Sequence, residues 1–345
     1  MTKKIDIKAG EHILISRTDR LGDLILSLPF VETIKAWYPK CQVDVLTSLY
    51  ASPILENNPS IDRIVRVQND QLMVDKLYKK DLLHRINLGE YQVVVALFPE
   101  RRISQLFYKA SIPVRVGTAG RFHSVFFNTH IFHSRKENKK HEYKYNLDFL
   151  KFFRGDTVIH KPRVYLKEKE IRNAHRILNG SGVQGSFIVL HPGSSGSAEE
   201  WPLENFLNLY QYLDEKGFEI IISGSEKEGK KIRDKARQME IDIRDITGET
   251  DLRTLAAVLS LAEVVVTNST GSLHLSTAVG TKVVGLYPRS RVTSPRRWGP
   301  LGEGNRVIQP PDEDYQYPNS CMESISVDRV ADEVVKVFET SRSLG

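Results

Sequence analysis

The sequence has few cysteines and no long apolar run, and both absences exclude classes of protein. Its 345 residues include two cysteines, Cys41 and Cys321, whose wide separation argues against a disulfide framework and suits a reducing compartment. Apolar runs such as residues 93–98 are far shorter than the ~20 residues that span a bilayer, so we expect no transmembrane helix. The first residues, MTKKIDIKAGEH, carry lysines without an apolar stretch and do not resemble a secretory signal. These absences predict a cytoplasmic protein.

Motifs for zinc and for nucleic acids are also missing. The ten histidines show no spacing that is typical of zinc ligands. No RNP signature or basic helical repeat accompanies the positive charge of the chain. We therefore expect no nucleic-acid partner.

Positive charge is concentrated in one part of the chain. The formal net charge is +6, and residues 121–163 contain ten lysines and arginines against four acidic residues. Phenylalanines alternate with these charges, at Phe122, Phe126, Phe127 and Phe132. Such a segment is either a solvated loop or a surface that attracts phosphorylated acceptors and anionic lipid headgroups.

Apolar strand-like runs alternate with helix-like segments, which predicts α/β architecture with parallel sheets. Strands are expected near residues 12–17, 42–47, 62–66, 92–97, 186–190, 219–222, 264–266 and 282–286. Gly117 and Gly120 are expected to mark turns. A polar stretch at residues 161–170 and a charged helix near residues 168–179 favour a domain boundary. We predict an N-terminal domain over residues 1–165, a second domain over residues 166–325 and a closing amphipathic helix over residues 326–345, with the two domains facing each other across a cleft.

The stretch RTDRLGDLILSLPF places Asp23 where a strand passes into a helix. The carboxyl ends of parallel strands and the amino ends of helices form the usual ligand crevice of open α/β sheets. Asp23 is therefore a candidate catalytic acid or base, and the alternative is an N-terminal cap of the helix.

Strands in the second half end in small polar residues that suit anion binding. HPGSSGS, residues 191–197, offers backbone N–H groups and the hydroxyls of Ser194 and Ser195, although it has neither P-loop nor dinucleotide-fingerprint order. NSTGSLH, residues 268–274, precedes a helix and is a candidate diphosphate site. Flexible loops and ordinary helix caps are the alternatives. Glu228 follows a further strand, where it could bind ribose hydroxyls or favour a helix start.

Taken together, these motifs resemble a known family. RTDRLGDLILSLPFVETIKAWYP, HPGSSGSAEEWPLENF, GSEKE, ITGETDL and VVVTNSTGSLHLSTAVGTKVVGLY are similar in order and spacing to the ADP-heptose:lipopolysaccharide heptosyltransferases of glycosyltransferase family 9. The resemblance extends over nearly the whole chain. It implies a GT-B fold with two Rossmann-like domains, a donor nucleotide bound by the C-terminal domain, an acceptor bound by the N-terminal domain, inversion at the anomeric carbon, and no required metal.

The resemblance also implies roles for individual residues. Asp23 corresponds to the catalytic base of the family. The predicted donor-binding residues are Ser194, Ser195, Glu228 (ribose), Thr250 (beside the adenine), Ser269, Thr270, Gly271 and His274. We place Arg17, Arg20 and Arg121 in the acceptor site.

This chain departs from the family pattern in its donor site. Ser269 replaces an aspartate that holds the donor sugar, and Glu199 replaces a lysine that faces the phosphates. A carboxylate there would repel a diphosphate, so we expect Glu199 to point away or other cations to take over, with Arg289, Arg291, Arg296 and Arg297 as candidates. The DxD motif at residues 312–314 belongs to a different transferase fold, so we interpret it as a solvated loop.

The predicted function is an inverting glycosyltransferase of lipopolysaccharide biosynthesis. It would transfer a sugar, with heptose from ADP-heptose as the first candidate, to a lipopolysaccharide core or related glycolipid at the inner face of the inner membrane. Its expected partners are the nucleotide sugar, the glycolipid and the anionic membrane surface. Two alternatives stay open: a transferase of the same fold with another nucleotide sugar, and a binding protein without turnover.

Overall fold

The computed structural model describes residues 4–153, 161–194, 196, 198–311 and 322–344. Ser195, Cys321 and the DxD motif at residues 312–314 lie outside the described residues, so the predictions for them are not addressed below. The chain divides into two compact units, Met1–Tyr165 and Leu166–Gly345. Each unit contains one sheet in which all neighbouring strands run parallel. The division falls within the polar stretch of residues 161–170.

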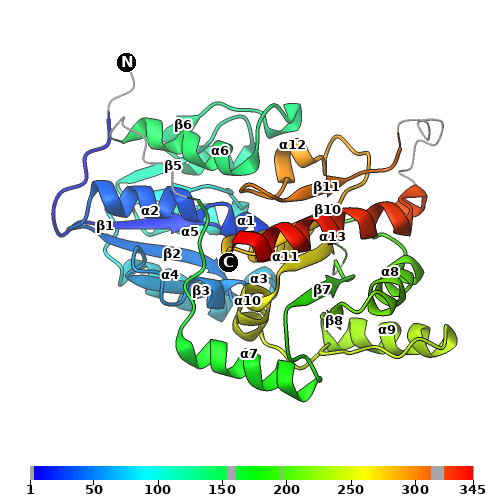
Figure 1. Cartoon of the computed structure of the whole chain (residues 1–345). Helices are drawn as coiled ribbons and strands as arrows, with labels where there is room; N and C mark the ends of the chain where they lie inside the picture. Colours follow the sequence, from blue (N-terminus) through cyan, green and yellow to red (C-terminus); the bar gives the residue numbers. More distant parts are fainter. Residues whose placement is uncertain (1–3, 154–160, 195, 197, 312–321, 345) are drawn as a thin grey trace. The chain divides into compact units, whose positions relative to one another are not determined.

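The first unit has a six-stranded sheet in the order β3-β2-β1-β4-β5-β6 (Figure 1). Its strands are β1 (His12–Ser16), β2 (Gln42–Ser48), β3 (Arg63–Val67), β4 (Val93–Ala96), β5 (Val114–Thr118) and β6 (Thr129–Ile131). Its α-helices are α1 (Leu21–Ile25), α2 (Leu28–Trp37), α3 (Asn69–Val74), α4 (Lys76–Asn87), α5 (Arg101–Lys109) and α6 (Glu142–Leu147). Short 3₁₀ helices are η1 (Ser52–Leu55), η2 (Phe122–Phe126), η3 (Arg135–Glu137) and η4 (Asp148–Phe152).

The central strands of the first unit are buried on both faces, as parallel sheets require. Ile13, Leu14 and Ile15 are fully buried, and the residues of β4 are equally apolar. Helix α2 contributes Phe30, whose ring meets Phe149 edge-on at 6.5 Å between centroids. The apolar runs of the sequence therefore predicted the positions of these strands correctly.

One predicted turn is wrong. Gly117 lies inside strand β5 and does not form a turn. A glycine is needed there because the Phe127 ring, from the segment before β6, packs against its backbone. A Cβ at Gly117 would be 2.5 Å from Cδ2 of Phe127. Gly120 does adopt a positive φ of 80° after the strand, as a turn residue would. Strand β6 follows at Thr129–Ile131 and was not predicted.

The second unit has a five-stranded sheet in the order β11-β10-β9-β7-β8. Its strands are β7 (Phe187–His191), β8 (Glu219–Ile222), β9 (Val264–Asn268), β10 (Lys282–Leu286) and β11 (Arg306–Ile308). Its helices are α7 (Glu168–Gly180), α8 (Leu203–Glu215), α9 (Glu226–Gln238), α10 (Leu252–Leu261), α11 (Gly271–Ala278), α12 (Pro295–Trp298), η6 (Met322–Ser324) and α13 (Val327–Leu344).

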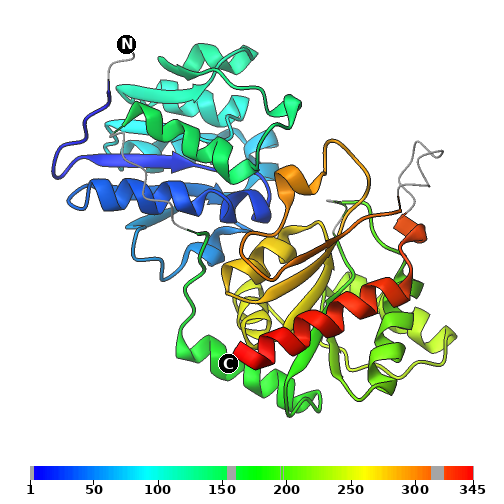
Figure 2. The same cartoon turned by 45° about the horizontal axis from the view of Figure 1, so that its top comes forward.

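Helix α13 covers one face of the second sheet (Figure 2). It packs on β9, β10 and helix α8. Val330, Ala331, Val334 and Phe338 are buried along its inner side, as the amphipathic spacing of the sequence predicted. Within the described residues, no helix combines the length and the apolar character needed to cross a membrane.

Candidate functional site

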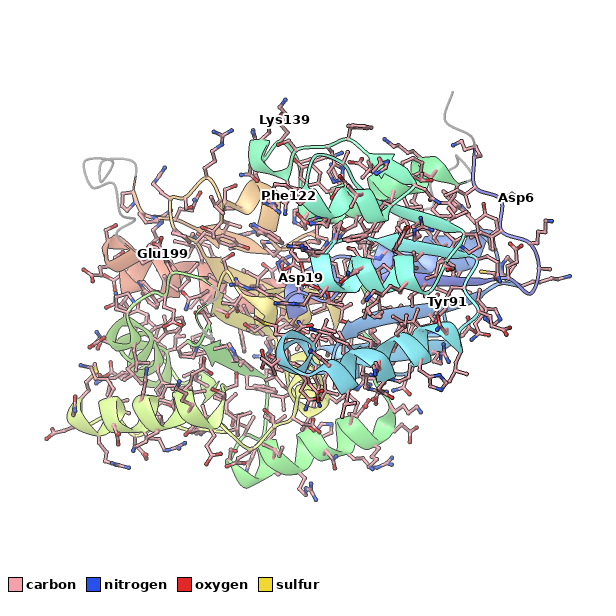
Figure 3. The ribbon with its side chains drawn as sticks, turned by 180° about the vertical axis from the view of Figure 1, so that it is seen from behind. Asp6, Asp19, Tyr91, Phe122, Lys139 and Glu199 are labelled. Carbon is pink, nitrogen blue, oxygen red and sulfur yellow. The ribbon has the colours of Figure 1, made fainter. Side chains whose placement is uncertain are left out.

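The strand order of the first unit locates its ligand crevice. The sheet order 3-2-1-4-5-6 changes direction between β1 and β4, and ligands of open α/β sheets bind beyond the carboxyl ends of the strands at such a point. Arg17 directly follows β1, and Phe98 follows β4. The guanidinium carbon of Arg17 lies 5.7 Å from the centroid of the Phe98 ring. Figure 3 shows Asp19 and Tyr91 at opposite ends of this sheet, with Asp19 at the carboxyl end.

Arg17 is the centre of a buried ionic cluster. Its side chain is 1% exposed and donates hydrogen bonds to three carboxylates and one amide. The acceptors are Asp19 Oδ1 at 2.7 Å, Glu142 Oε1 at 3.3 Å, Asn146 Oδ1 at 2.9 Å and, by a short contact, Asp23 Oδ1. Burial alone would lower the pKa of Arg17, but the surrounding carboxylates raise it above its usual value. Arg17 therefore stays charged.

Helix α6, which lies more than 100 residues after Arg17 in the sequence, contributes Glu142 and Asn146 to this cluster. Glu142 has no exposed side-chain surface and also pairs with Arg135 Nε at 3.0 Å. Asn146 donates to the backbone oxygen of Leu26 at 3.0 Å and so ties α6 to the end of α1. Neither residue was predicted, and the only signal for them was their i, i+4 spacing, which places them on one helix face.

Asp23 lies in the first turn of α1 and does not cap it. The helix begins after Arg20 without a side-chain cap from that residue, and the Asp23 carboxylate bonds to Arg17 instead. Burial, together with the negative charges of Asp19 and Glu142, raises the pKa of Asp23 to about 7, although Arg17 opposes the rise. A carboxylate with this pKa is a stronger base than an ordinary aspartate. The capping alternative is therefore not what the structure shows.

The predicted acceptor residues have different surroundings. Arg17 was predicted to contact an acceptor. It is buried and binds the Asp23 carboxylate instead. Arg20 and Arg121 are exposed, and a contact with an acceptor stays a prediction for both. Within residues 121–163, Phe127 is a core residue at 4% exposure and Arg135 pairs with buried Glu142, so these two side chains do not contribute to an exposed basic surface.

The second unit has its own switch point, between β7 and β9. Its sheet order corresponds to 2-1-3-4-5, which changes direction at these two strands. The loops that follow them are residues 192–202 and residues 269–270. Both loops carry predicted donor-binding residues, so the topology brings together the motifs that the sequence singled out.

Asn268 joins these two loops and was not predicted. Its side chain is fully buried, donates to the backbone oxygen of Pro192 at 2.7 Å and accepts from the backbone N–H of Trp201 at 2.9 Å. The amide thus joins the two ends of the loop between residues 192 and 201. A polar residue at the carboxyl end of an apolar strand was the only signal for this role.

Inside this loop, Ser194 is bound by a carboxylate of the chain itself. Its N–H and its hydroxyl donate to Glu200 Oε1, at 2.9 and 2.5 Å. These donors were predicted to bind the nucleotide, which would have to compete with Glu200 for them. Glu199 is exposed and is labelled in Figure 3.

Helix α11 begins with buried hydroxyl groups. Thr270 is its N-cap residue, but its Oγ1 bonds to Ser272 Oγ at 2.6 Å instead of capping the helix, and Ser272 also contacts Thr267 Oγ1 at 2.9 Å. An ordinary side-chain cap, the alternative for this segment, is thus absent at Thr270. The first N–H groups of such a helix suit an anion.

The remaining residues of this segment lie close by. Gly271 is the first residue of α11. His274 is 4% exposed, and its ring centroid is 6.5 Å from that of Trp298. Ser269 lies near buried Tyr287, where burial raises the pKa of the phenol and a hydrogen bond with Ser269 opposes the rise.

Glu228 has a structural role that the sequence offered as its alternative. Its Oε2 accepts from the N–H and the hydroxyl of Ser225, at 2.8 and 2.7 Å, in a capping box at the start of α9. The same carboxylate packs against Gly193. A Cβ at this glycine would lie 2.1 Å from Oε1 of Glu228, so a side chain there would clash. Glu228 therefore lies beside the loop after β7. Thr250 is half-buried before α10, and its predicted adenine contact stays a prediction.

Comparisons with known proteins show the family to which this chain belongs. A family model described as glycosyltransferase family 9 (heptosyltransferase) matches residues 80–324, more than half of the 345 residues. A protein of Haemophilus influenzae to which glycosyltransferase activity has been attributed is 27% identical over 336 residues, which cover 94% of this chain and 96% of the relative.

Solved structures show the same fold. A glycosyl transferase family 9 protein of Veillonella parvula has a TM-score of 0.88 at 21% identity and covers 98% of this chain and 100% of its own. ADP-heptose lipopolysaccharide heptosyltransferase II of E. coli has a TM-score of 0.77 at 20% identity and covers 96% of this chain and 99% of its own. The chain is therefore a glycosyltransferase of GT-B fold that belongs to glycosyltransferase family 9, the heptosyltransferase family.

Proposed function

We propose that the protein is an inverting glycosyltransferase that transfers heptose from ADP-heptose to a lipopolysaccharide core or a related glycolipid. The observation that carries the proposal is the Asp23 carboxylate, which buried Arg17 holds at the switch point of the first sheet. Family membership supports the choice of donor, since the E. coli relative is an ADP-heptose lipopolysaccharide heptosyltransferase.

In this mechanism Asp23 is the general base. Its ionised carboxylate takes the proton of the acceptor hydroxyl, and the hydroxyl oxygen then attacks the anomeric carbon of the donor sugar. The bond from that carbon to the diphosphate breaks on the opposite face, so the configuration inverts and ADP leaves. The raised pKa of Asp23, about 7, supports this role because it increases the affinity of the carboxylate for the proton.

The leaving diphosphate would bind at the start of α11. The helix N-terminus favours negative charge, and Thr270, Gly271 and His274 lie there. We place no metal ion in this step. The additional positive charge would come from the arginines that follow β10, with Arg289, Arg291, Arg296 and Arg297 as candidates.

Two departures of the sequence favour a second candidate, a transferase that uses another nucleotide sugar. Ser269 lacks the carboxylate that the family resemblance implies for the donor sugar, and exposed Glu199 stands in place of a lysine. The organised Asp23 site argues against the third possibility, a binding protein without turnover.

A donor panel tests these proposals. ADP-heptose and representative UDP-, GDP- and CMP-sugars are each added to the protein, and thermal stabilisation and sugar transfer are recorded. Stabilisation and transfer with ADP-heptose alone support the heptosyltransferase. The second candidate is supported if a different nucleotide sugar gives both signals, and binding without transfer or hydrolysis for every donor contradicts the enzyme mechanism.

We also propose that the protein works at an anionic membrane surface. A glycolipid acceptor presents its sugars and phosphates there, and cationic side chains near such a surface each contribute about 1 kcal/mol of attraction. The net charge of +6 supports this proposal.

A further inference from the structure

Helices α3, α4 and α5 of the first unit line a cavity of about 620 Å³. This volume falls in the range of small-molecule sites. Six cationic side chains line it: Lys76, Lys79, Lys80, Arg101, Arg102 and Lys109. The cavity is therefore large enough for a headgroup and strongly positive.

The positive charge of this cavity is not balanced by the protein. Glu100 is the single acidic residue in the lining, and its carboxylate accepts from the N–H of Ile103 at 3.0 Å as the cap of α5. Across the part of the chain that the structure describes, none of the six cations forms an ion pair. Lysines three and four residues apart, as on α4, repel each other, and a bound anion would relieve this repulsion.

The basic segment that the sequence indicated looks different. Within residues 121–163, Lys139 pairs with Glu137 at 2.5 Å, and Lys140 pairs with Asp148 by a short contact. Arg135 is held by buried Glu142. Figure 3 shows Lys139 extending away from the fold. Three of the ten cations of this segment are therefore compensated by neighbouring carboxylates.

Apolar side chains accompany the cationic cavity. Leu72, Leu83 and Leu106 contribute to its lining. Beside it, the corner between α3 and α4 exposes Val74 and Leu77, at 83% and 74%. The transfer of exposed aliphatic side chains from water into lipid is favourable. Binding of a free anion from water would not bury these side chains and would not be strengthened by them.

The corner is fixed by hydrogen bonds, so these groups have defined positions. Asp75 Oδ1 caps α4 by accepting from the N–H groups of Leu77 and Tyr78, at 2.7 and 3.1 Å. The N–H of Gln68 donates to the Tyr78 hydroxyl at 2.7 Å. At the other end of α3, Asn69 donates to the backbone oxygen of Thr18 at 2.9 Å, in the loop that carries Asp19 and precedes Asp23.

We propose that this cavity binds the phosphate of an anionic phospholipid headgroup and that Val74 and Leu77 enter the surface of the bilayer. The site would hold the first unit on the membrane and fix the orientation of the Asp23 loop through α3. It deepens the proposed function and rests on it for the membrane-borne acceptor. The six cations attract the headgroup, and the aliphatic corner selects lipid over a soluble phosphate.

Vesicle co-sedimentation of the full chain tests the proposal, with phosphatidylcholine alone or mixed with phosphatidylglycerol, at low and high salt. The cavity variant is Lys79→Ser, Lys80→Ser, Arg101→Ser. Its matched control is Lys139→Ser, Lys144→Ser, Lys151→Ser, which removes the same charge from exposed positions of the other basic segment. We expect the parent to bind only anionic vesicles and to dissociate at high salt. The cavity variant should bind roughly tenfold to a hundredfold more weakly, and the control should resemble the parent.

A second pair of measurements separates lipid from free anion. Because pyrophosphate can also bind at the start of α11, its binding to the cavity is measured as the calorimetric binding that the cavity variant loses. Val74→Ser, Leu77→Ser should weaken vesicle binding and leave that part of pyrophosphate binding unchanged. A parent that ignores vesicles but binds pyrophosphate through the cavity, so that the cavity variant loses this binding, would overturn the proposal in favour of a soluble anion. Equal vesicle binding by the cavity variant and the parent, both with unchanged thermal unfolding, would also overturn it.

The test does not depend on turnover. Asp23→Asn, which should slow transfer strongly, is expected to bind vesicles like the parent. Loss of vesicle binding in that variant alone would contradict the assignment of the membrane site to the cavity. A parent that transfers sugar to an acceptor but ignores anionic vesicles would overturn the membrane site and leave the proposed function standing.

Discussion

The two units carry different chemistry at equivalent positions of their sheets. In the first unit, the switch point holds a buried cluster of charges around Arg17. In the second, it holds hydroxyls, backbone groups and the amide of Asn268, with the carboxylates of Glu200 and Glu228 beside the loop after β7. The same topology therefore carries two kinds of polar site. In the proposed function, Asp23 needs a tuned pKa to take up a proton, whereas a diphosphate needs N–H and hydroxyl donors and would have to compete with Glu200 for those of Ser194.

The largest effect is expected at Asp23. Asp23→Asn keeps the shape of the side chain and removes the proton acceptor, so the transfer rate should fall by ~10²–10⁴. Nucleotide binding, measured by calorimetry, should stay close to that of the parent because the proposed donor residues belong to the second unit. Near-normal transfer by this variant would show that Asp23 is not the general base, and the proposed division of work between the two units would fail.

The same variant should change stability in a pH-dependent way. Because the pKa of Asp23 is raised from 3.8 to about 7, the folded protein holds this proton more tightly than the unfolded chain. Ionisation therefore lowers stability as the pH rises from about 4 towards 7, by at most about 4 kcal/mol. Asp23→Asn should be more stable than the parent at pH 8 and similar at pH 4, as measured by urea unfolding. A less stable variant at pH 8 would show that the Arg17 ion pair outweighs burial.

Asn268 provides the corresponding test in the second unit. Asn268→Ala leaves the oxygen of Pro192 and the N–H of Trp201 without their partner, which should cost about 2–3 kcal/mol of unfolding free energy. The apparent KM for the donor should rise because the loop between residues 192 and 201 loses the amide that joins its two ends. Ser194→Ala is the milder control. It removes a hydroxyl that donates to Glu200 and Ala198 and accepts from the N–H of Gly196, and it leaves both links of Asn268 in place. An unchanged donor KM in Asn268→Ala would separate this loop from nucleotide binding.

Thr270 should show a smaller effect on the donor. Thr270→Ala removes a hydroxyl from the start of α11, and we expect roughly tenfold weaker binding of nucleotide diphosphate. Because Thr270 is 7% exposed and bonded to Ser272, the variant should also lose about 1 kcal/mol of stability. Thr270→Ser retains the hydroxyl and serves as control. Equal affinity of the alanine variant and the parent in calorimetry would move the diphosphate site elsewhere; His274→Ala then tests the next turn of the helix.

The smallest effect concerns pH and tests how the ionic cluster tunes Asp23. For the parent, kcat/KM should fall as the pH drops below about 7, since protonation removes the base. Glu142→Gln keeps the size of the side chain but removes a negative charge that raises the pKa of Asp23. The midpoint should therefore move to lower pH, by up to about one unit. An unmoved midpoint in a folded Glu142→Gln variant would contradict the electrostatic link between α6 and Asp23.

Local patterns in the sequence predicted most of the strands and the positions of the site loops. The run around Ile13–Ile15 is apolar because both faces of a central parallel strand are covered, and such runs are visible without a structure. Polar residues immediately after such strands, such as Arg17 and Thr270, were visible for the same reason. Strand β6 and strand β11 were missed because each has only three residues and lies outside the central apolar runs.

Roles that depend on distant partners could not be predicted. Arg17 and Arg121 are both arginines beside a predicted site, yet only the fold shows that Arg17 is buried among carboxylates. The basic segment at residues 121–163 gave a strong compositional signal because a count of charges ignores ion pairs. The cavity lined by α4 and α5 gave none, since its cations come from two segments about twenty residues apart in the chain.

The sequence alone determined the α/β class, the family resemblance and the presence of Asp23 after the first strand. These features follow from local periodicity and from the residues that border each strand, and both are written along the chain. Only the tertiary structure decided that Asp23 shares a buried site with Glu142 and that Asn268 closes the loop after β7. Those contacts join residues dozens of positions apart, and their energies depend on burial, which arises only when the sheets and helices pack together.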